Sequence, residues 1–173
     1  MITSYSSNII FFDTEFSSLD FTRGEILSLG FVKSDGEELY LELEFDGVVD
    51  EWPRENILPN LSHCKVSRGR ARELVEDFIG EDKPYVVAYV NQFDMIYFYK
   101  FFGLENFNEK FNWIPIDFAS ILFSLGVDSE ILVKREESFF DKLQIDLSEY
   151  HQHNALDDAR LLREVYIKLI GNP

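Results

Sequence analysis

The chain has 173 residues, of which 46% are hydrophobic, and this size and composition suit one α/β domain with a buried core over residues 1–173. Its net charge of −16 argues against a broad, sequence-independent grip on duplex nucleic acid, because such binding needs a basic surface. The charge still allows an enzyme that holds only the last few nucleotides of a strand. Cys64 is the one cysteine in the sequence, which excludes an internal disulfide and a cysteine-based zinc site.

The sequence also bears on location. No apolar stretch approaches the length of a membrane span, and polar residues instead of a signal peptide follow the first methionine. We therefore expect a cytoplasmic protein with no membrane partner.

The first third of the chain predicts three antiparallel strands. An apolar run from Asn8 to Phe12 is rich in residues that favour strands and predicts a buried one. Residues 25–33 predict a second strand, and residues 37–45 predict a third, whose side chains alternate between apolar and polar. Ser34-Asp35-Gly36 lies between them and is a hairpin signal.

The middle of the chain alternates helices and strands. Residues 51–61 hold two prolines and predict an irregular connection with one helical turn. Apolar residues at helical spacing predict a helix over 68–80. Residues 84–90 are almost continuously apolar and predict a central, parallel strand, followed by a helix over 93–102 that ends at Gly103.

The last third predicts a fifth strand over Trp113–Ile116 and a helix from Asp117, its N-cap, to Leu125. Residues 127–150 are ambiguous, with a short helix around Phe139–Leu143, and the chain ends in a helix over Ala155–Ile170. This order of elements is that of a ribonuclease H-like α/β fold, with a mixed five-stranded sheet and helices on both faces.

One basic cluster stands out in the sequence KVSRGRAR, at Lys65, Arg68, Arg70 and Arg72. It fits either the solvated start of a helix or a receptor for phosphates. We favour the first interpretation.

Two acids, Asp13 and Glu15, follow the first apolar run with one residue between them. Because side chains alternate across a strand, both carboxylates project to the same side. Carboxylates so close together repel each other and resist desolvation, and a divalent cation such as Mg²⁺ or Mn²⁺ is the simplest remedy. The alternative is a strand end that merely reaches solvent with two acids.

The last predicted helix carries an acid in line with its apolar stripe. Asp158 is followed at i+4, i+7 and i+11 by Leu162, Val165 and Leu169. An acid on a buried face is usually paired or bound to a metal, so Asp158 is a candidate ligand. Its neighbour Asp157 points about 100° away around the helix and is explained by capping after Asn154.

Two further candidates each have a second interpretation. Asp94 shares a helix face with aromatic residues, but it also lies in the first turn after Asn91, where an acid is favourable. His153 lies five positions before Asp158 and is a candidate general base, since histidine titrates near neutral pH. An ordinary loop histidine is the alternative. His151 competes with His153, and we rank it lower because His153 directly adjoins the cap of the helix.

Three short motifs stand in order along the chain: DTE at Asp13 to Glu15, NQFD at Asn91 to Asp94, and HNALDD at His153 to Asp158. Together they resemble the three exonuclease motifs of the DEDDh, DnaQ-like 3′–5′ exonucleases, and the resemblance covers essentially the whole chain. Within that group the chain looks most like the compact stand-alone 3′–5′ exoribonucleases. Phe16 departs from the proofreading exonucleases and oligoribonuclease, in which a Thr-Gly commonly follows the acidic pair.

The resemblance implies hydrolysis of the 3′-terminal phosphodiester with two divalent metal ions, Mg²⁺ or Mn²⁺, and release of nucleoside 5′-monophosphates. It implies that Asp13 bridges both ions, that Glu15 and Asp158 hold the ion that carries the attacking water, and that Asp94 supports the other. It also implies that His153 accepts the proton of that water. Four carboxylates would neutralise two such ions.

The resemblance also sets expectations for the substrate. The expected partner is the 3′ end of a single-stranded nucleic acid, RNA in preference to DNA, and a homodimer stays open because related stand-alone enzymes often form one. We expect Phe16 to stack on a terminal base, with core packing as the alternative, and Thr14 and Asn91 to contact the substrate. A DNA exonuclease of repair or proofreading type and a non-catalytic binding domain are the alternative functions.

Overall fold

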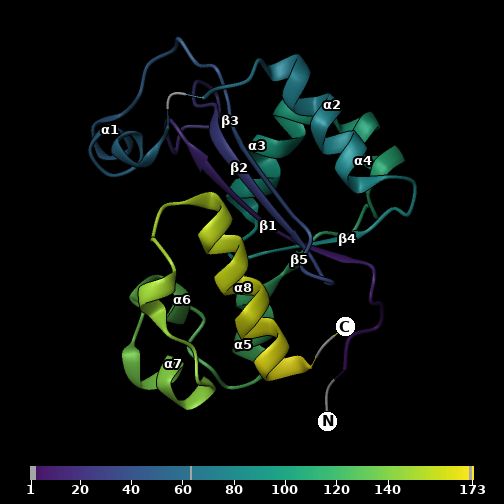
Figure 1. Ribbon diagram of the computed structural model, residues 1–173, viewed down its shortest axis with the longest axis vertical. Coiled ribbons are helices and arrows are strands. Elements are labelled where there is room, and N and C mark those ends of the chain that lie inside the picture. Colours follow the sequence, from purple (N-terminus) through teal and green to yellow (C-terminus); the bar gives the residue numbers. More distant parts are fainter. Residues whose placement is uncertain (1–2, 63, 172) are drawn as a thin grey trace.

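Five strands form one mixed sheet in the part of the chain that the computed structural model describes, residues 3–62, 64–171 and 173 (Figure 1). The strands are β1 (Ile9–Phe16), β2 (Ile26–Lys33), β3 (Glu38–Glu42), β4 (Tyr85–Ala88) and β5 (Ile116–Asp117). Their order across the sheet is β3-β2-β1-β4-β5. β2 is antiparallel to β1 and β3, whereas β4 is parallel to β1 and β5. The predicted α/β fold with a mixed sheet is confirmed.

Helices cover both faces of the sheet, as predicted, because β1 buries side chains on each face (Figure 1). Ile10 and Phe12 belong to the core on one face, whose helices are α2 (Arg68–Ile79), α3 (Gln92–Phe102) and α4 (Leu104–Lys110). Ile9 and Phe11 belong to the core on the other, whose helices are α5 (Phe118–Ser124), α6 (Ile131–Lys134), α7 (Glu137–Leu143) and α8 (Ala155–Ile170). Burying one such side chain contributes about 1.5–3 kcal/mol. Both cores therefore depend on β1.

Most helix boundaries lie where the sequence places them. α2, α3 and α8 each match their predicted bounds to within one residue. Gly80 and Gly103, with φ of 71° and 89°, end α2 and α3 in a conformation that glycine adopts easily. The side chain of Asp117 accepts a hydrogen bond from the backbone N–H of Ser120 and so caps α5, as predicted. Asn154 caps α8 in the same way.

A fifth strand is present as predicted, but its predicted bounds were wrong. The sequence indicates Trp113–Ile116, whereas β5 is Ile116–Asp117 and pairs with β4 through two residues only. Trp113 is 70% exposed, so its aromatic ring does not mark a buried strand. Pro115 has no N–H for a sheet ladder, which explains why the strand begins after it.

Three connections contain more helix than the sequence predicts, and one of them is the segment after Gly103, where α4 was not predicted. Residues 51–61 fold into α1 (Glu51–Asn56) and a 3₁₀ turn, η1 (Leu58–Asn60). Pro53 lies in the first turn of α1, where a missing N–H costs no helical hydrogen bond. Residues 127–150 contain α6, α7 and a second 3₁₀ turn, η2 (Leu147–Glu149). Within residues 3–62 and 64–171, no helix has both the length and the apolar character needed to cross a membrane.

A close approach between β2 and the start of α8 positions the cavity described below. β1 continues past its apolar run to Phe16, and Asp13 pairs with Gly30 of β2. A Cβ atom added to Gly30 would collide with the backbone carbonyl of Ala155 and lie 2.5 Å from the backbone nitrogen of Leu156. The first turn of α8 can therefore lie against β2 next to Asp13 only because residue 30 is glycine.

We predict that Gly30→Ala destabilises the protein by about 1–3 kcal/mol, because the backbone of α8 must move to admit the methyl group. Chemical unfolding monitored by circular dichroism measures the change. Gly69→Ala is the matched control, because Gly69 lies in the first turn of α2 and nothing lies within 4 Å of the added Cβ. A Gly30→Ala protein as stable as the wild type would contradict the predicted collision.

Candidate active site

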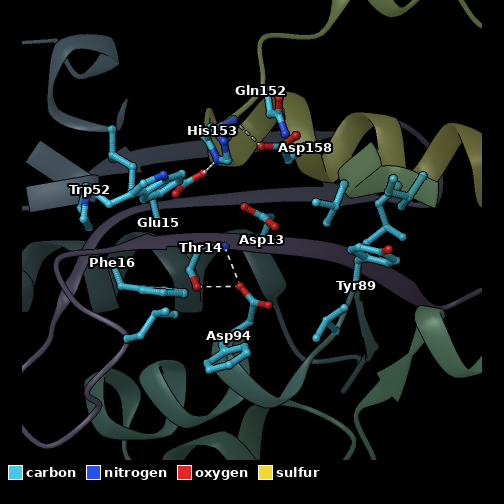
Figure 2. Close-up of a pocket in the computed structure, with 18 of the residues that line it drawn as sticks. Asp13, Thr14, Glu15, Phe16, Trp52, Tyr89, Asp94, Gln152, His153 and Asp158 are labelled. Carbon is cyan, nitrogen blue, oxygen red and sulfur yellow. Dashed lines mark hydrogen bonds and ion pairs between the residues drawn. The ribbon is translucent and has the colours of Figure 1, made fainter. Parts of the chain in front are cut away.

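Four acids and a histidine meet at one cavity of about 610 Å³ near the end of β1 (Figure 2). Asp13 and Glu15 extend from β1, Asp94 from the first turn of α3, and Asp158 from the first turn of α8. In Figure 2, Asp13 lies between Asp158 on one side and Asp94 on the other. With His153 from the loop before α8, the five residues predicted as catalytic all line the same cavity.

Thr14 fixes the carboxylate of Asp94. The backbone N–H and the hydroxyl of Thr14 both donate to Asp94 Oδ1, at 2.9 and 2.7 Å (Figure 2). Both residues are buried, with 4% and 5% exposure. Thr14 was predicted to contact the substrate; it lines the cavity, where its hydroxyl is bonded to Asp94, and the contact stays a prediction.

Both oxygens of Asp158 accept hydrogen bonds. Arg135 donates from Nη2 to Oδ1 at 3.0 Å, and the backbone N–H of His153 donates to Oδ2 at 2.9 Å. His153 has a φ of 63°, in the left-handed region that residues other than glycine seldom adopt. The bond to Asp158 supports this backbone conformation and brings the imidazole to the cavity.

The ring of His153 lies close to both Glu15 and Trp52. Its Nδ1 is 3.8 Å from Glu15 Oε1, and its ring meets the indole of Trp52 edge to face, with centroids 4.8 Å apart. Trp52 comes from α1, the segment predicted to be irregular. A perpendicular aromatic contact of this kind restrains the orientation of the imidazole.

The donor set suits a divalent cation. Glu15, His153 and Asp158 each offer one ligand atom, and these atoms lie within 4.8 Å of one another. Asp13 and Asp94 add carboxylate oxygens to the same cavity. Mg²⁺ and Mn²⁺ prefer such hard oxygen ligands.

The electrostatics of Asp13 and Glu15, the two acids on β1, are unfavourable without a counter-charge. Burial raises the pKa of Asp13 well above its ordinary value, and repulsion from Asp94, Asp158 and Glu15 raises it further. Burial, with repulsion from Asp158 and Asp94, raises the pKa of Glu15 to about 8. A cation in the cavity would reverse this repulsion.

Neighbouring groups of the protein partly offset the raised pKa values of Asp94 and Asp158, the two acids on helices. Burial raises the pKa of Asp94 to about 7 despite the hydrogen bonds from Thr14. Burial raises the pKa of Asp158 to about 6, against the opposing effect of Arg135. Burial and Arg135 together lower the pKa of His153, which keeps the imidazole neutral near pH 7.

Asp157 and His151 form a separate pair. Asp157 Oδ2 accepts from the backbone N–H of His151 at 3.1 Å and lies 3.0 Å from its ring Nδ1, while Oδ1 accepts from Arg160. Burial alone would raise the pKa of Asp157, and these hydrogen bonds hold it below its ordinary value. Asp157 is buried, with 7% exposure, and neither Asp157 nor His151 lines the cavity. The pair is therefore separate from the acid cluster.

Of the other two predicted substrate contacts, Phe16 lies at the cavity and Asn91 does not. Phe16 lines the cavity and stacks on Tyr97, with ring centroids 4.5 Å apart and planes 13° apart. Asn91 lies at the start of α3, and its backbone N–H donates to Asp117, but its side chain makes no capping bond and it does not line the cavity.

Trp52 and Arg135 are the functional candidates that sequence reasoning missed. Trp52 lies in a stretch with two prolines, which masks the short helix α1. Arg135 lies in the ambiguous segment 127–150, where no periodicity indicates which side chains point inward. Neither had a sequence signal that linked it to the acids.

The arginines of the basic cluster are engaged elsewhere. Arg68 pairs with Glu25, Arg70 donates to Glu73, and Arg72 donates to the carbonyl of Phe101. None of them lines the cavity. These contacts agree with the first interpretation, the start of a helix.

We predict that the metal-free protein loses stability as the pH rises from about 4.5 to about 8. The pKa of Glu15 in the folded state is raised from 4.5 to about 8, so the unfolded chain releases its proton first and folding becomes less favourable over this interval. Unfolding in excess EDTA at several pH values measures the effect. A Glu15→Gln variant should show a shallower decline, and an equally steep decline would contradict the assignment.

The comparisons with known proteins bear on the fold. No protein-family model and no curated protein matches the sequence. The structure is similar to that of a moderately thermophilic exonuclease I from Methylocaldum szegediense, with a TM-score of 0.59 and 15% identity over 93% of this chain and 40% of that one. The chain therefore spans less than half the length of that protein. At this identity the similarity establishes the fold: a ribonuclease H-like α/β sheet of the kind found in that exonuclease.

Proposed function

We propose that this chain is a divalent-metal-dependent 3′–5′ exonuclease that removes nucleoside 5′-monophosphates from the 3′ end of short or single-stranded RNA. The observation that carries the proposal is the convergence of four acids and His153 from separate elements on one cavity. The fold shared with an exonuclease I agrees with it. The preference for RNA rests on the resemblance of the motifs to compact stand-alone exoribonucleases.

The four carboxylates are the groups that would hold the metal ions: Asp13, Glu15, Asp94 and Asp158. Their mutual repulsion in a buried position is the feature that a pair of divalent cations would relieve. When bound, such ions would stabilise charge on the entering and leaving oxygens of the phosphodiester.

His153 is the residue proposed to accept the proton of the attacking water. Its lowered pKa leaves the imidazole neutral and able to accept a proton near pH 7. The hydrogen bond to Asp158 and the contact with Trp52 hold the ring at the cavity before the substrate arrives.

The cavity wall suggests how so acidic a protein holds a nucleic acid. Phe16, Leu19, Trp52 and Phe93 give it apolar surfaces on which bases can pack whatever their sequence. A net charge of −16 disfavours a long phosphate track. Both features support a grip on the terminal nucleotides alone.

We predict that 5′-labelled RNA is shortened stepwise from its 3′ end in the presence of Mn²⁺ or Mg²⁺. His153→Ala should slow this reaction by about 10²–10⁴-fold, because it removes the general base. Gel electrophoresis of a time course measures the ladder, and chromatography identifies the released mononucleotide.

DNA of the same sequence is the comparison substrate, and His151→Ala is the matched control, since His151 pairs with Asp157 instead of the acid cluster. Equal trimming of DNA would move the substrate class to that of a DNA exonuclease. Loss of both ladders with intact metal binding would leave a nucleic-acid-binding domain.

We also predict that Mn²⁺ raises the melting temperature of the wild type. A ligand at 100 times its Kd stabilises a protein by about 2.7 kcal/mol, which is on the order of 5–10 °C for a chain of this size. Asp13→Ala should abolish most of the gain, because Asp13 lies among the other three acids. An unchanged shift in that variant, measured by differential scanning calorimetry, would rule out Asp13 as a ligand.

A further inference from the structure

Arg135 joins three segments around the acid cluster. It follows α6 in a left-handed conformation, with a φ of 48°, and its side chain is 16% exposed. One arm of the guanidinium, Nη1, donates to the backbone carbonyl of Tyr150 at 2.8 Å. The other arm, Nη2, donates to Asp158 Oδ1 at 3.0 Å. A single side chain thus ties α6 to the loop before α8 and to the first turn of α8.

The two acceptors of Arg135 flank His153. Tyr150 lies three residues before it, and Asp158 accepts a hydrogen bond from its backbone N–H through the other carboxylate oxygen. His153 occupies a left-handed conformation, which is strained for a residue with a side chain and persists only where surrounding contacts impose it. Arg135 holds the chain at Tyr150 and orients the Asp158 carboxylate that accepts from the backbone N–H of His153.

We propose, on the basis of the function proposed above, that Arg135 is a positioning residue for the acid cluster. Its planar fork holds the Asp158 carboxylate toward the cavity and fixes the segment that carries His153, so that it strengthens the binding of a divalent cation at this end of the site. A carboxylate that ligates a metal can keep a hydrogen bond from a neighbouring group, and such outer partners set the ligand's orientation.

A simple counter-ion role makes the opposite prediction. If Arg135 only neutralised charge, its removal would leave the acids more negative and would tighten the binding of a cation. If it positions Asp158, its removal weakens that binding. The sign of the change in metal affinity therefore separates the two roles.

The experiment titrates Mn²⁺ into metal-stripped wild type, Arg135→Gln and Arg135→Lys by isothermal calorimetry, with circular dichroism to check the fold. We expect Arg135→Gln to bind Mn²⁺ about 10–100-fold more weakly. Arg135→Lys keeps the charge but lacks the fork that spans both acceptors, so its affinity should lie between those of the wild type and Arg135→Gln. In turnover assays, Arg135→Gln should lower kcat and leave KM unchanged.

Arg163→Gln is the matched control. Arg163 lies on α8 and also donates to two acceptors, the backbone carbonyls of Lys33 and Ser34, but it contacts none of the acids. The Arg163→Gln variant should bind Mn²⁺ with the affinity of the wild type. Hydrogen exchange of the segment 150–154, measured without metal, should accelerate in Arg135→Gln and not in Arg163→Gln.

Tighter or unchanged Mn²⁺ binding by a folded Arg135→Gln protein would overturn the inference and leave the proposed function intact. If that variant does not fold, Arg135→Lys decides: wild-type affinity would overturn the inference, and weakened affinity would support it. A wild-type protein that binds no Mn²⁺ would overturn the proposed function, and the inference with it.

Discussion

The burial of like charge at one end of β1 is the constraint on which this structure depends. Nothing in the acids themselves favours their meeting, since burial and mutual repulsion both raise their pKa values. The free energy that holds them together comes from the two apolar cores on either side of the strand, where Phe11 and Phe12 are fully buried. The acid cluster therefore destabilises the fold locally, and the two apolar cores offset that free energy, as is common at functional sites.

The protein divides the four acids into two kinds. The two acids on helices are fixed by donors of the chain: Asp94 by Thr14, and Asp158 by Arg135 and the backbone of His153. The two acids on β1, Asp13 and Glu15, are repelled by the other carboxylates, and a bound cation would offset that repulsion. Fixed carboxylates on either side of β1 form a preorganised site, in which little has to move when ions and substrate bind.

The elements that could be predicted from the sequence are those whose apolar residues recur at the spacing of a strand or a helix. The period of the strands and helices located β1, α2, α3 and α8, and with them every acid of the site. Residues that act through a single contact could not be predicted. Arg135 reaches Asp158 from the end of α6, and Trp52 reaches His153 from α1, both short helices without a clear apolar period. Thr14 bonds Asp94 across 80 positions of sequence. The bounds of the fifth strand could not be predicted for a related reason, because a strand of two residues is too short to show a period.

The alternation of β1 has a consequence for how this chain can evolve. Even-numbered residues from Ile10 to Thr14 face α3 and its core, and odd-numbered residues from Ile9 to Glu15 face α8 and the cavity. An insertion or deletion of one residue within the strand would exchange the two sets and carry carboxylates into the aromatic core. The strand therefore admits no change of length, whereas a connection such as the exposed residues 46–48 can lengthen at small cost. Divergence among proteins built on this plan should accumulate in such connections and leave the length of β1 constant.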